Sequence, residues 1–312
     1  MRAFAVRSFG EAAAILDLPV PADDGAYLIR VKVGGVNPID YKLAERLTTA
    51  STFPFVLGAD FAGVVERAPA GAGDFRVGDR IFGMARGHGA YAEYTSVTPG
   101  SKTEPLALIP EGVSDEQAAA LPIPGVTALQ SLELLGVAAG QRVVVMGATG
   151  GVGGFAVQMA RARGAYVIAT VRGDADEGRR LGAEEVYDTK VGDVIAAIHE
   201  AHPDGVDAVF DLVNGKDAIG RDAEILKRGG SLVSTIYAAD EKWFAERGIT
   251  AHNIAGNTNP LSTTKGLNEI VGMLAAGTIT ARVRSTVGLD GAAEVIEKLK
   301  SGGLRGKAVI RL

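Results

Sequence analysis

The pattern of apolar and polar residues divides the chain into two regions. In the first region, short apolar runs at 27–33, 63–66 and 91–97 are bounded by glycine, proline and aspartate residues. Such runs predict short β-strands that form a small barrel or sandwich. The pattern changes near Ser114 and Gln117, which have the spacing of a helix capping box before the apolar stretch 118–121.

After residue 125, strand-like apolar runs alternate with helical patterns. The predicted strands are 142–146, 166–171, 186–187, 208–212 and 231–235, and the predicted helices are 126–135, 153–163, 177–181, 194–200 and 218–226. This alternation predicts a parallel, doubly wound α/β sheet. We therefore expect one domain over residues 1–121 and a second over 122–261, with part of the tail 262–312 returning to the first.

Composition excludes several classes of function. The chain has 312 residues, 47% of them hydrophobic, a net charge of −5 and no cysteine. A chain of this length suits two domains, the acidic balance argues against a nucleic-acid partner, and cysteine metal sites are impossible. No uninterrupted apolar stretch approaches the roughly 18 residues of a membrane span, and the start does not read as a signal peptide. We expect a cytoplasmic protein.

The strongest chemical signal is a glycine-rich loop at 142–156, which reads RVVVMGATGGVGGFA. An apolar strand leads into tightly spaced glycines and then into a helical pattern, as in dinucleotide-binding folds. Glycine lets phosphate oxygens approach the backbone, and the helix start offers free N–H groups. The candidate cofactor-binding residues are Ala148, Thr149, Gly150, Gly151, Val152 and Gly153. The alternative is a glycine-rich turn without a ligand.

The next predicted strand indicates which dinucleotide is bound. Sites for an unphosphorylated ribose carry an acidic residue at its end, but this strand is followed by Arg172. A guanidinium attracts a 2′-phosphate and binds it in bidentate fashion, so we expect NADPH. Arg179 and Arg180, about one helical turn further on, are further candidates to bind the 2′-phosphate. The alternative is that all three arginines are solvent-exposed side chains at a helix start.

Several segments together resemble one protein family. They are 36–42 (VNPIDYK), 57–66 (LGADFAGVVE), 77–83 (VGDRIFG), 89–94 (GAYAEY), 119–128 (AALPIPGVTA), the glycine loop and 305–309 (RGKAV). In this order they are similar to the zinc-independent, ζ-crystallin-like quinone oxidoreductases of the medium-chain dehydrogenase/reductase superfamily. The resemblance implies a GroES-like β-barrel catalytic domain, completed by 262–312, and a Rossmann domain inserted into it. It also implies a homodimer.

Compared with the zinc-dependent members, the chain lacks the metal-binding residues. Asn37 stands where those enzymes have a cysteine, and Ala59-Asp60 stands where they have a His-Glu pair. We therefore expect no metal, since zinc needs several converging ligands. Without a Lewis acid, the favoured reaction is hydride addition to an electron-poor acceptor, a quinone or an α,β-unsaturated carbonyl.

Site residues follow from the same reasoning. Asn37 and Tyr41 are the candidates to hydrogen-bond the developing oxyanion, although Asn37 can instead cap a turn and Tyr41 can instead pack. Asp60 is expected to order this pocket, or else to bond its own loop. Thr127 matches the family threonine near the nicotinamide. Val213, Ile236 and Tyr237 follow predicted strands at their carboxyl ends, where such sheets bind ligands. Trp243 is a candidate for the substrate mouth, or else a packing or dimer contact.

The leading hypothesis is an NADPH-dependent, zinc-independent reductase of quinones or activated enones. Two alternatives stay open. One is a reductase of enoyl thioesters, as in polyketide pathways, and the other is a non-catalytic NADPH-binding protein.

Overall fold

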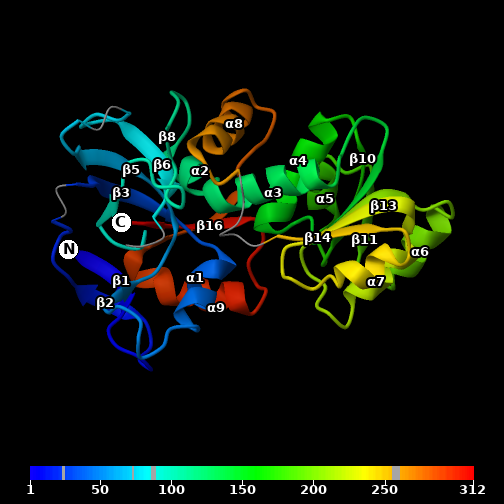
Figure 1. Cartoon of the computed structure of the whole chain (residues 1–312), viewed down its shortest axis with the longest axis horizontal. Coiled ribbons are helices and arrows are strands. Elements are labelled where there is room, and N and C mark those ends of the chain that lie inside the picture. Colours follow the sequence, from blue (N-terminus) through cyan, green and yellow to red (C-terminus); the bar gives the residue numbers. More distant parts are fainter. Residues whose placement is uncertain (23–24, 72–73, 86–88, 255–260) are drawn as a thin grey trace. The chain divides into compact units, whose positions relative to one another are not determined.

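The computed structural model describes residues 1–22, 25–71, 74–85, 89–254 and 261–312. These residues form two compact units (Figure 1). The first unit contains Met1–Val126, Ser262–Gly277 and Ala281–Leu312, and the second contains Thr127–Leu261 and Thr278–Thr280. The sequence predicts boundaries after residues 121 and 261, and the first division of the structure lies slightly later, inside helix α3 (Pro122–Leu134).

The first unit is built on a seven-stranded sheet with the order β15-β16-β3-β5-β6-β8, in which β7 also pairs with β3. Its strands are β3 (Tyr27–Gly35), β5 (Asp60–Arg67), β6 (Arg80–Met84), β7 (Tyr94–Val97), β8 (Leu106–Leu108), β15 (Val283–Gly288) and β16 (Lys307–Arg311). The last strand of the chain, β16, pairs antiparallel with β3, and Val309 lies opposite Gly35. The last strand of the chain therefore lies inside the sheet, between β15 and β3.

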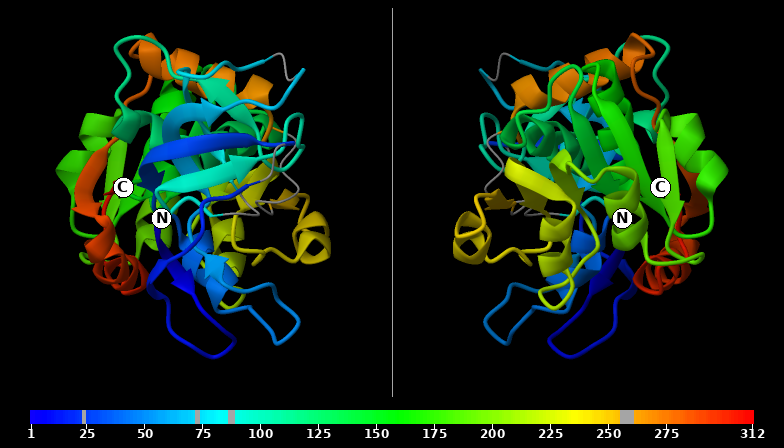
Figure 2. Two further views of the ribbon diagram at one scale, coloured as in Figure 1. Left: turned by 90° about the vertical axis from the view of Figure 1, so that its left-hand side faces the viewer. Right: turned by 90° about the vertical axis from the view of Figure 1, so that its right-hand side faces the viewer.

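A smaller sheet and several helices complete this unit. The sheet has the order β2-β1-β4, with β1 (Arg2–Val6), β2 (Ala14–Asp17) and β4 (Phe55–Val56). The helices are α1 (Pro38–Ala44), α2 (Asp115–Ala119), α8 (Thr264–Ala275), the 3₁₀-helix η2 (Leu289–Gly291) and α9 (Ala292–Lys300). Helix α9 lies beside the first strands in both views of Figure 2. Val295 and Ile296 of α9 belong to the same hydrophobic core as Phe4 and Val6 of β1.

The second unit is a six-stranded parallel sheet with the order β11-β10-β9-β12-β13-β14. The strands are β9 (Arg142–Met146), β10 (Tyr166–Val171), β11 (Glu185–Asp188), β12 (Val206–Asp211), β13 (Leu226–Ser234) and β14 (Thr250–Asn253). The helices are α4 (Gly151–Ala162), α5 (Ala175–Leu181), α6 (Val194–Ala201), η1 (Ile219–Glu224) and α7 (Glu241–Ala245). Counted from β9, this is the 3-2-1-4-5-6 order of the Rossmann fold. The predicted fold class is confirmed.

One predicted helix is wrong in type. The stretch 218–226 forms the short 3₁₀-helix η1, and Leu226 already begins strand β13 opposite Val206. The glycines that follow, Gly229 and Gly230, allow the strand to bend where its register with β12 shifts. Helices α1 and α7 and strand β14 are absent from the sequence predictions, because each is shorter than the window that reveals a period.

Candidate functional site

The glycine loop forms the turn between β9 and α4. Gly147 has a φ of 81°, a left-handed conformation that favours glycine. A Cβ on Gly153 would stand 2.4 Å from the Gly147 carbonyl oxygen, so glycine at this position lets the helix pack against the turn. Gly150 caps α4 without a side-chain hydrogen bond. The first N–H groups of the helix therefore point out from the turn, as anion binding requires.

Thr170, near the end of β10, holds this turn in place. The backbone N–H of Gly147 donates to the Thr170 hydroxyl at 3.1 Å. The N–H of Ala148 donates to the Thr170 carbonyl oxygen at 2.9 Å. The neighbouring strand thus fixes the first two residues of the turn.

Replacing Thr170 by valine removes the hydroxyl acceptor while the shape of the side chain stays almost the same. We expect Thr170→Val to lower the free energy of unfolding by about 1 kcal/mol, because the partly buried Gly147 N–H loses its partner. Urea denaturation measures the change. Thr170→Ser keeps the hydroxyl and is the control, and equal losses in both variants would contradict this account.

Exposed apolar side chains gather at the same edge of the parallel sheet. Val213, Ile236 and Tyr237 are 56%, 39% and 54% exposed, and they follow the carboxyl ends of the adjacent strands β12 and β13. A Cβ on Gly147 would lie 2.7 Å from Val213 Cγ1, so Val213 flanks the glycine turn. Large apolar side chains that remain in solvent at a sheet edge are typical of a ligand site.

The backbone of this edge is also unusual at Tyr237, whose φ is 59°. The N–H groups of Ile236 and Ala238 both donate to the Ser234 hydroxyl, at 3.4 and 3.2 Å, and hold the turn around it. Left-handed backbone at a residue other than glycine stores strain and is found most often at functional sites.

Cationic side chains lie where β10 ends. Arg172 follows Val171, the last residue of the strand, and its side chain is exposed. A Cβ on Gly173 would stand 2.9 Å from the Lys190 ammonium, so Lys190 lies next to this segment. The N–H groups of Gly173 and Lys190 both donate to Asp188 Oδ1, at 2.8 and 2.9 Å. Asp188 therefore joins the two loops that carry Arg172 and Lys190.

Lys190 is not among the residues predicted from the sequence, although the parallel pairing of β10 with β11 brings Val171 opposite Asp188. The two further arginines considered for the 2′-phosphate, Arg179 and Arg180, form ion pairs on their own helix. Arg179 contacts Asp176 at 3.3 Å and Arg180 contacts Glu177 at 3.5 Å.

A buried polar network lies in the first unit around Asn37. The Lys307 ammonium donates to the Val36 carbonyl oxygen at 2.7 Å and to Asn37 Oδ1 at 2.6 Å. Asn37 Nδ2 donates in turn to Asp60 Oδ2 at 2.8 Å. Gly35 explains the convergence, because it pairs with Asp60 on one side and with Val309 of β16 on the other.

The second carboxyl of the network belongs to Asp40. Its Oδ2 accepts from the Tyr91 hydroxyl at 2.6 Å and from the Asn37 backbone N–H at 2.8 Å. The latter bond closes the N-terminus of α1, with Asn37 as the cap and Pro38 in the first turn.

Burial shifts the protonation equilibria of the whole network. Desolvation raises the pKa of Asp40 to about 6 and the pKa of Asp60 to about 7, against the opposing effect of the Lys307 charge. Desolvation likewise lowers the pKa of the Lys307 ammonium. The pKa of the Tyr91 phenol rises well above its usual value, through burial and then through the Asp40 charge.

The residues considered for binding the acceptor differ in whether their polar atoms already have hydrogen-bond partners. Both polar atoms of the Asn37 amide are engaged by Asp60 and Lys307, and Asp60 is fully buried, so both act inside the network. Tyr41 is partly buried against the same core, with the Lys300 ammonium 5.2 Å from its ring centre. Among the described residues, no hydrogen bond engages its hydroxyl. Thr127 is buried in α3, where its carbonyl oxygen accepts from Ser131.

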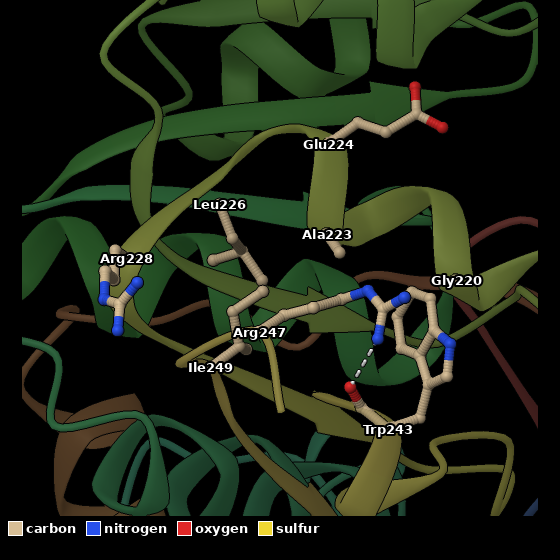
Figure 3. Close-up of a pocket in the computed structure, with 8 residues that line it drawn as sticks. All are labelled: Gly220, Ala223, Glu224, Leu226, Arg228, Trp243, Arg247 and Ile249. Carbon is tan, nitrogen blue, oxygen red and sulfur yellow. Dashed lines mark hydrogen bonds between the residues drawn. The ribbon is translucent and has the colours of Figure 1, made fainter. Parts of the chain in front are cut away.

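Trp243 lies apart from the glycine turn. It lines an open hollow formed by residues of η1, the start of β13 and the segment before β14, and Arg247 stacks over its ring at 3.6 Å (Figure 3). The hollow is therefore at the amino ends of the strands, whereas the glycine turn follows a carboxyl end. A substrate role for Trp243 stays a prediction.

No group of three His, Asp or Glu side chains placed to hold a metal ion occurs in the described part of the chain. His202 contacts Glu185 at 3.1 Å and His199 contacts the Glu224 carbonyl oxygen at 2.9 Å. Among residues with described positions, no helix is long and apolar enough to cross a membrane.

Comparison with known proteins identifies the family. The family model of the alcohol dehydrogenase GroES-like domain matches residues 23–108, and one described as zinc-binding dehydrogenase matches 181–310. Quinone oxidoreductase from Rattus norvegicus is 32% identical, over 100% of this chain and 98% of that protein. The solved quinone oxidoreductase of Coxiella burnetii has a TM-score of 0.89 at 28% identity, covering 100% and 99% of the two chains.

The Escherichia coli quinone oxidoreductase, solved in complex with NADPH, has a TM-score of 0.88 at 25% identity and covers 100% of both chains. The chain is an oxidoreductase of the medium-chain dehydrogenase/reductase superfamily. Within it, the chain belongs to the zinc-independent quinone oxidoreductase branch, as the sequence resemblance predicts.

Proposed function

We propose that the protein is an NADPH-dependent reductase that transfers a hydride to a quinone or an α,β-unsaturated carbonyl without a metal. The observation that carries the proposal is the set of groups at the carboxyl edge of the parallel sheet. This edge combines a glycine turn, uncapped N–H groups of α4, two cations after β10 and β11, and exposed apolar residues. Relatives that are quinone oxidoreductases, one of them solved with NADPH, support it.

Each group has a proposed task. The N–H groups at the start of α4 hold the pyrophosphate, while Arg172 and Lys190 hold the 2′-phosphate. Val213, Ile236 and Tyr237 pack against the nicotinamide end and exclude water. NADPH, when bound, supplies the hydride. A metal is unnecessary because the acceptor is already electron-poor and needs only orientation and hydrogen bonds to its oxygen.

The test is turnover. Purified protein with NADPH is assayed against a panel of quinones, free enones and matched enoyl thioesters, with and without a chelator. We expect NADPH oxidation with quinones or enones that the chelator leaves unchanged. Absence of turnover with every acceptor, despite tight NADPH binding, would favour a non-catalytic NADPH-binding protein instead.

A second candidate is reduction of enoyl thioesters. A mycocerosic acid synthase-like polyketide synthase from Mycobacterium tuberculosis is 33% identical over 69% of this chain, although the match covers only 10% of that protein. A second relative favours free enones as the substrates. It is 2-methylene-furan-3-one reductase from Solanum lycopersicum, which is 33% identical over 66% of this chain and 53% of that protein. Faster turnover of the thioester than of its matched enone would decide for the second candidate.

Tyr41 is the residue that we propose to donate a hydrogen bond to the acceptor oxygen, with Asn37 and Asp60 positioning its helix. We expect Tyr41→Phe to lower kcat for quinones about tenfold or more, because the developing oxyanion loses a donor. NADPH affinity should be unchanged. Tyr166→Phe, which removes an exposed hydroxyl bonded to Glu185, is the control. An unchanged kcat in Tyr41→Phe would mean that Tyr41 only packs, since phenylalanine keeps its ring.

A further inference from the structure

Two buried aspartates lie behind the turn that follows β12. Asp211 is the last residue of the strand and is fully buried. Its Oδ1 accepts hydrogen bonds from the backbone N–H groups of Val213 at 2.7 Å and Asn214 at 2.8 Å. One carboxylate oxygen thus sets the conformation of the turn that carries Val213, the residue beside Gly147.

Asp222, in η1, approaches the same turn from the other side. It is also fully buried, and its Oδ1 accepts from Asn214 Nδ2 at 3.2 Å. Asn214 therefore bonds both carboxyls, through its backbone N–H to Asp211 and through its side-chain amide to Asp222. In the described part of the chain, Oδ2 of each is buried without any N–H or O–H donor.

Two ionised carboxylates can only accept hydrogen bonds, and in a buried space on one asparagine they repel each other. A proton on one of them relieves this repulsion and gives the pair a donor. Burial, followed by the bond to Asp211 and its charge, raises the pKa of Asp222 to about 9. The proton therefore stays on Asp222 at neutral pH, while the Asp211 carboxyl accepts from two backbone N–H groups.

The charged groups around η1 are engaged elsewhere. Arg221 lowers the pKa of Asp222, but its guanidinium pairs with Asp193 at 2.8 Å and Glu224 at 3.6 Å. His199 of α6 bonds the Glu224 carbonyl oxygen, and the β13 residue opposite Asp211 is the uncharged Ser234. Lys227, at the start of β13, pairs with Asp207.

We infer that Asp211 and Asp222 share one proton, and that this carboxyl–carboxylate pair positions the Val213–Asn214 turn for the dinucleotide. The inference rests on the proposed function only in that the turn contacts the cofactor. When Asp222 loses its proton, two like charges face each other in a buried space and the bonds that hold the turn weaken. Cofactor affinity then falls with the ionisation of Asp222.

The test compares NADPH dissociation constants, measured by fluorescence, between about pH 7 and about pH 10, where the 2′-phosphate is already ionised. We expect the wild-type affinity to fall about tenfold over this range, as two carboxylates come to face each other. Asp222→Asn supplies an amide that donates to Asp211 and accepts from Asn214. It should match the wild type near neutral pH and lose the alkaline fall. Asp222→Leu, which can do neither, should bind NADPH about tenfold more weakly throughout.

Asp217→Asn, at an exposed position on the same loop, is the control. Its NADPH dissociation constant should change with pH as that of the wild type does. The inference is overturned if Asp222→Asn shows the same alkaline fall as the wild type, or if the wild type shows none. Carbon NMR of the aspartate carboxyls gives a second reading, in which Asp222 should titrate near pH 9. If neither NADPH nor NADH binds at any pH, the proposed function fails, and the NMR titration still decides whether the proton is shared.

Discussion

Replacing Lys307 by methionine is expected to lower the free energy of unfolding by about 3–5 kcal/mol near pH 8. The Lys307 side chain is only 4% exposed, and its ammonium donates to Val36 O and to Asn37 Oδ1. Methionine fills a similar volume but leaves both acceptors without a donor. It also removes a cation that lowers the pKa of Asp40 and of Asp60.

The size of the loss should depend on pH, with a sign that follows from the two carboxyls. The folded-state pKa values of about 6 for Asp40 and about 7 for Asp60 lie above the value of 3.8 for a free aspartate. A carboxyl with a raised pKa favours the folded state most when protonated, so stability falls as pH rises through these values. Without Lys307 the carboxyls ionise still less readily in the fold. The penalty of Lys307→Met should therefore be larger near pH 8 than near pH 5.

Urea denaturation at both pH values measures this difference. Lys298→Met, at an exposed lysine of α9, is the control and should change the midpoint little. Adding Asp60→Asn to Lys307→Met should recover part of the loss, because a neutral amide needs no counter-charge. A Lys307→Met protein that unfolds at the wild-type urea concentration near pH 8 would show that the ammonium contributes no net stabilisation.

The glycine turn can be predicted from the sequence, whereas the buried network around Asn37 is much harder to predict. Residues 142–156 form a strand, a turn and a helix in succession, so the local pattern predicts the local structure. Lys307 and Asn37 are separated by most of the chain and meet because β16 inserts beside β3. The sequence does carry a signal for this, since Lys307 and Asp60 stand within apolar runs where an unpaired charge is costly.

In the second unit, the positions of Lys190 and Asp222 likewise depend on contacts that the sequence pattern does not predict. Lys190 reaches Gly173 because β11 lies parallel to β10, and a correct strand register would have located it. Asp222 lies in a stretch that the periodicity assigns to an ordinary helix, where an aspartate would be expected to face solvent. In the structure it is fully buried, and Asn214 of the turn after β12 bonds it. Patterns thus predict elements well, and predict contacts only when the order of the elements in space is known.

The cofactor preference should reverse when Arg172 is replaced by aspartate. In the proposed site, the guanidinium and the Lys190 ammonium both face the 2′-phosphate of NADPH. A carboxylate there repels the phosphate and can accept hydrogen bonds from the ribose hydroxyls of NADH. We expect the ratio of kcat/KM for NADPH to that for NADH to fall on the order of a hundredfold or more.

Lys190 should contribute less than Arg172, because its exposed ammonium is well hydrated and cannot bind a phosphate through two N–H groups. Lys190→Met should lower the preference about fivefold, and added salt should weaken the effect. Arg179→Met is the matched control, since its guanidinium pairs with Asp176 on the same helix, and it should leave the ratio unchanged. A wild-type protein that binds NADH more tightly than NADPH would refute the assignment of Arg172. If Arg179→Met loses the preference for NADPH, the 2′-phosphate is bound by α5 instead.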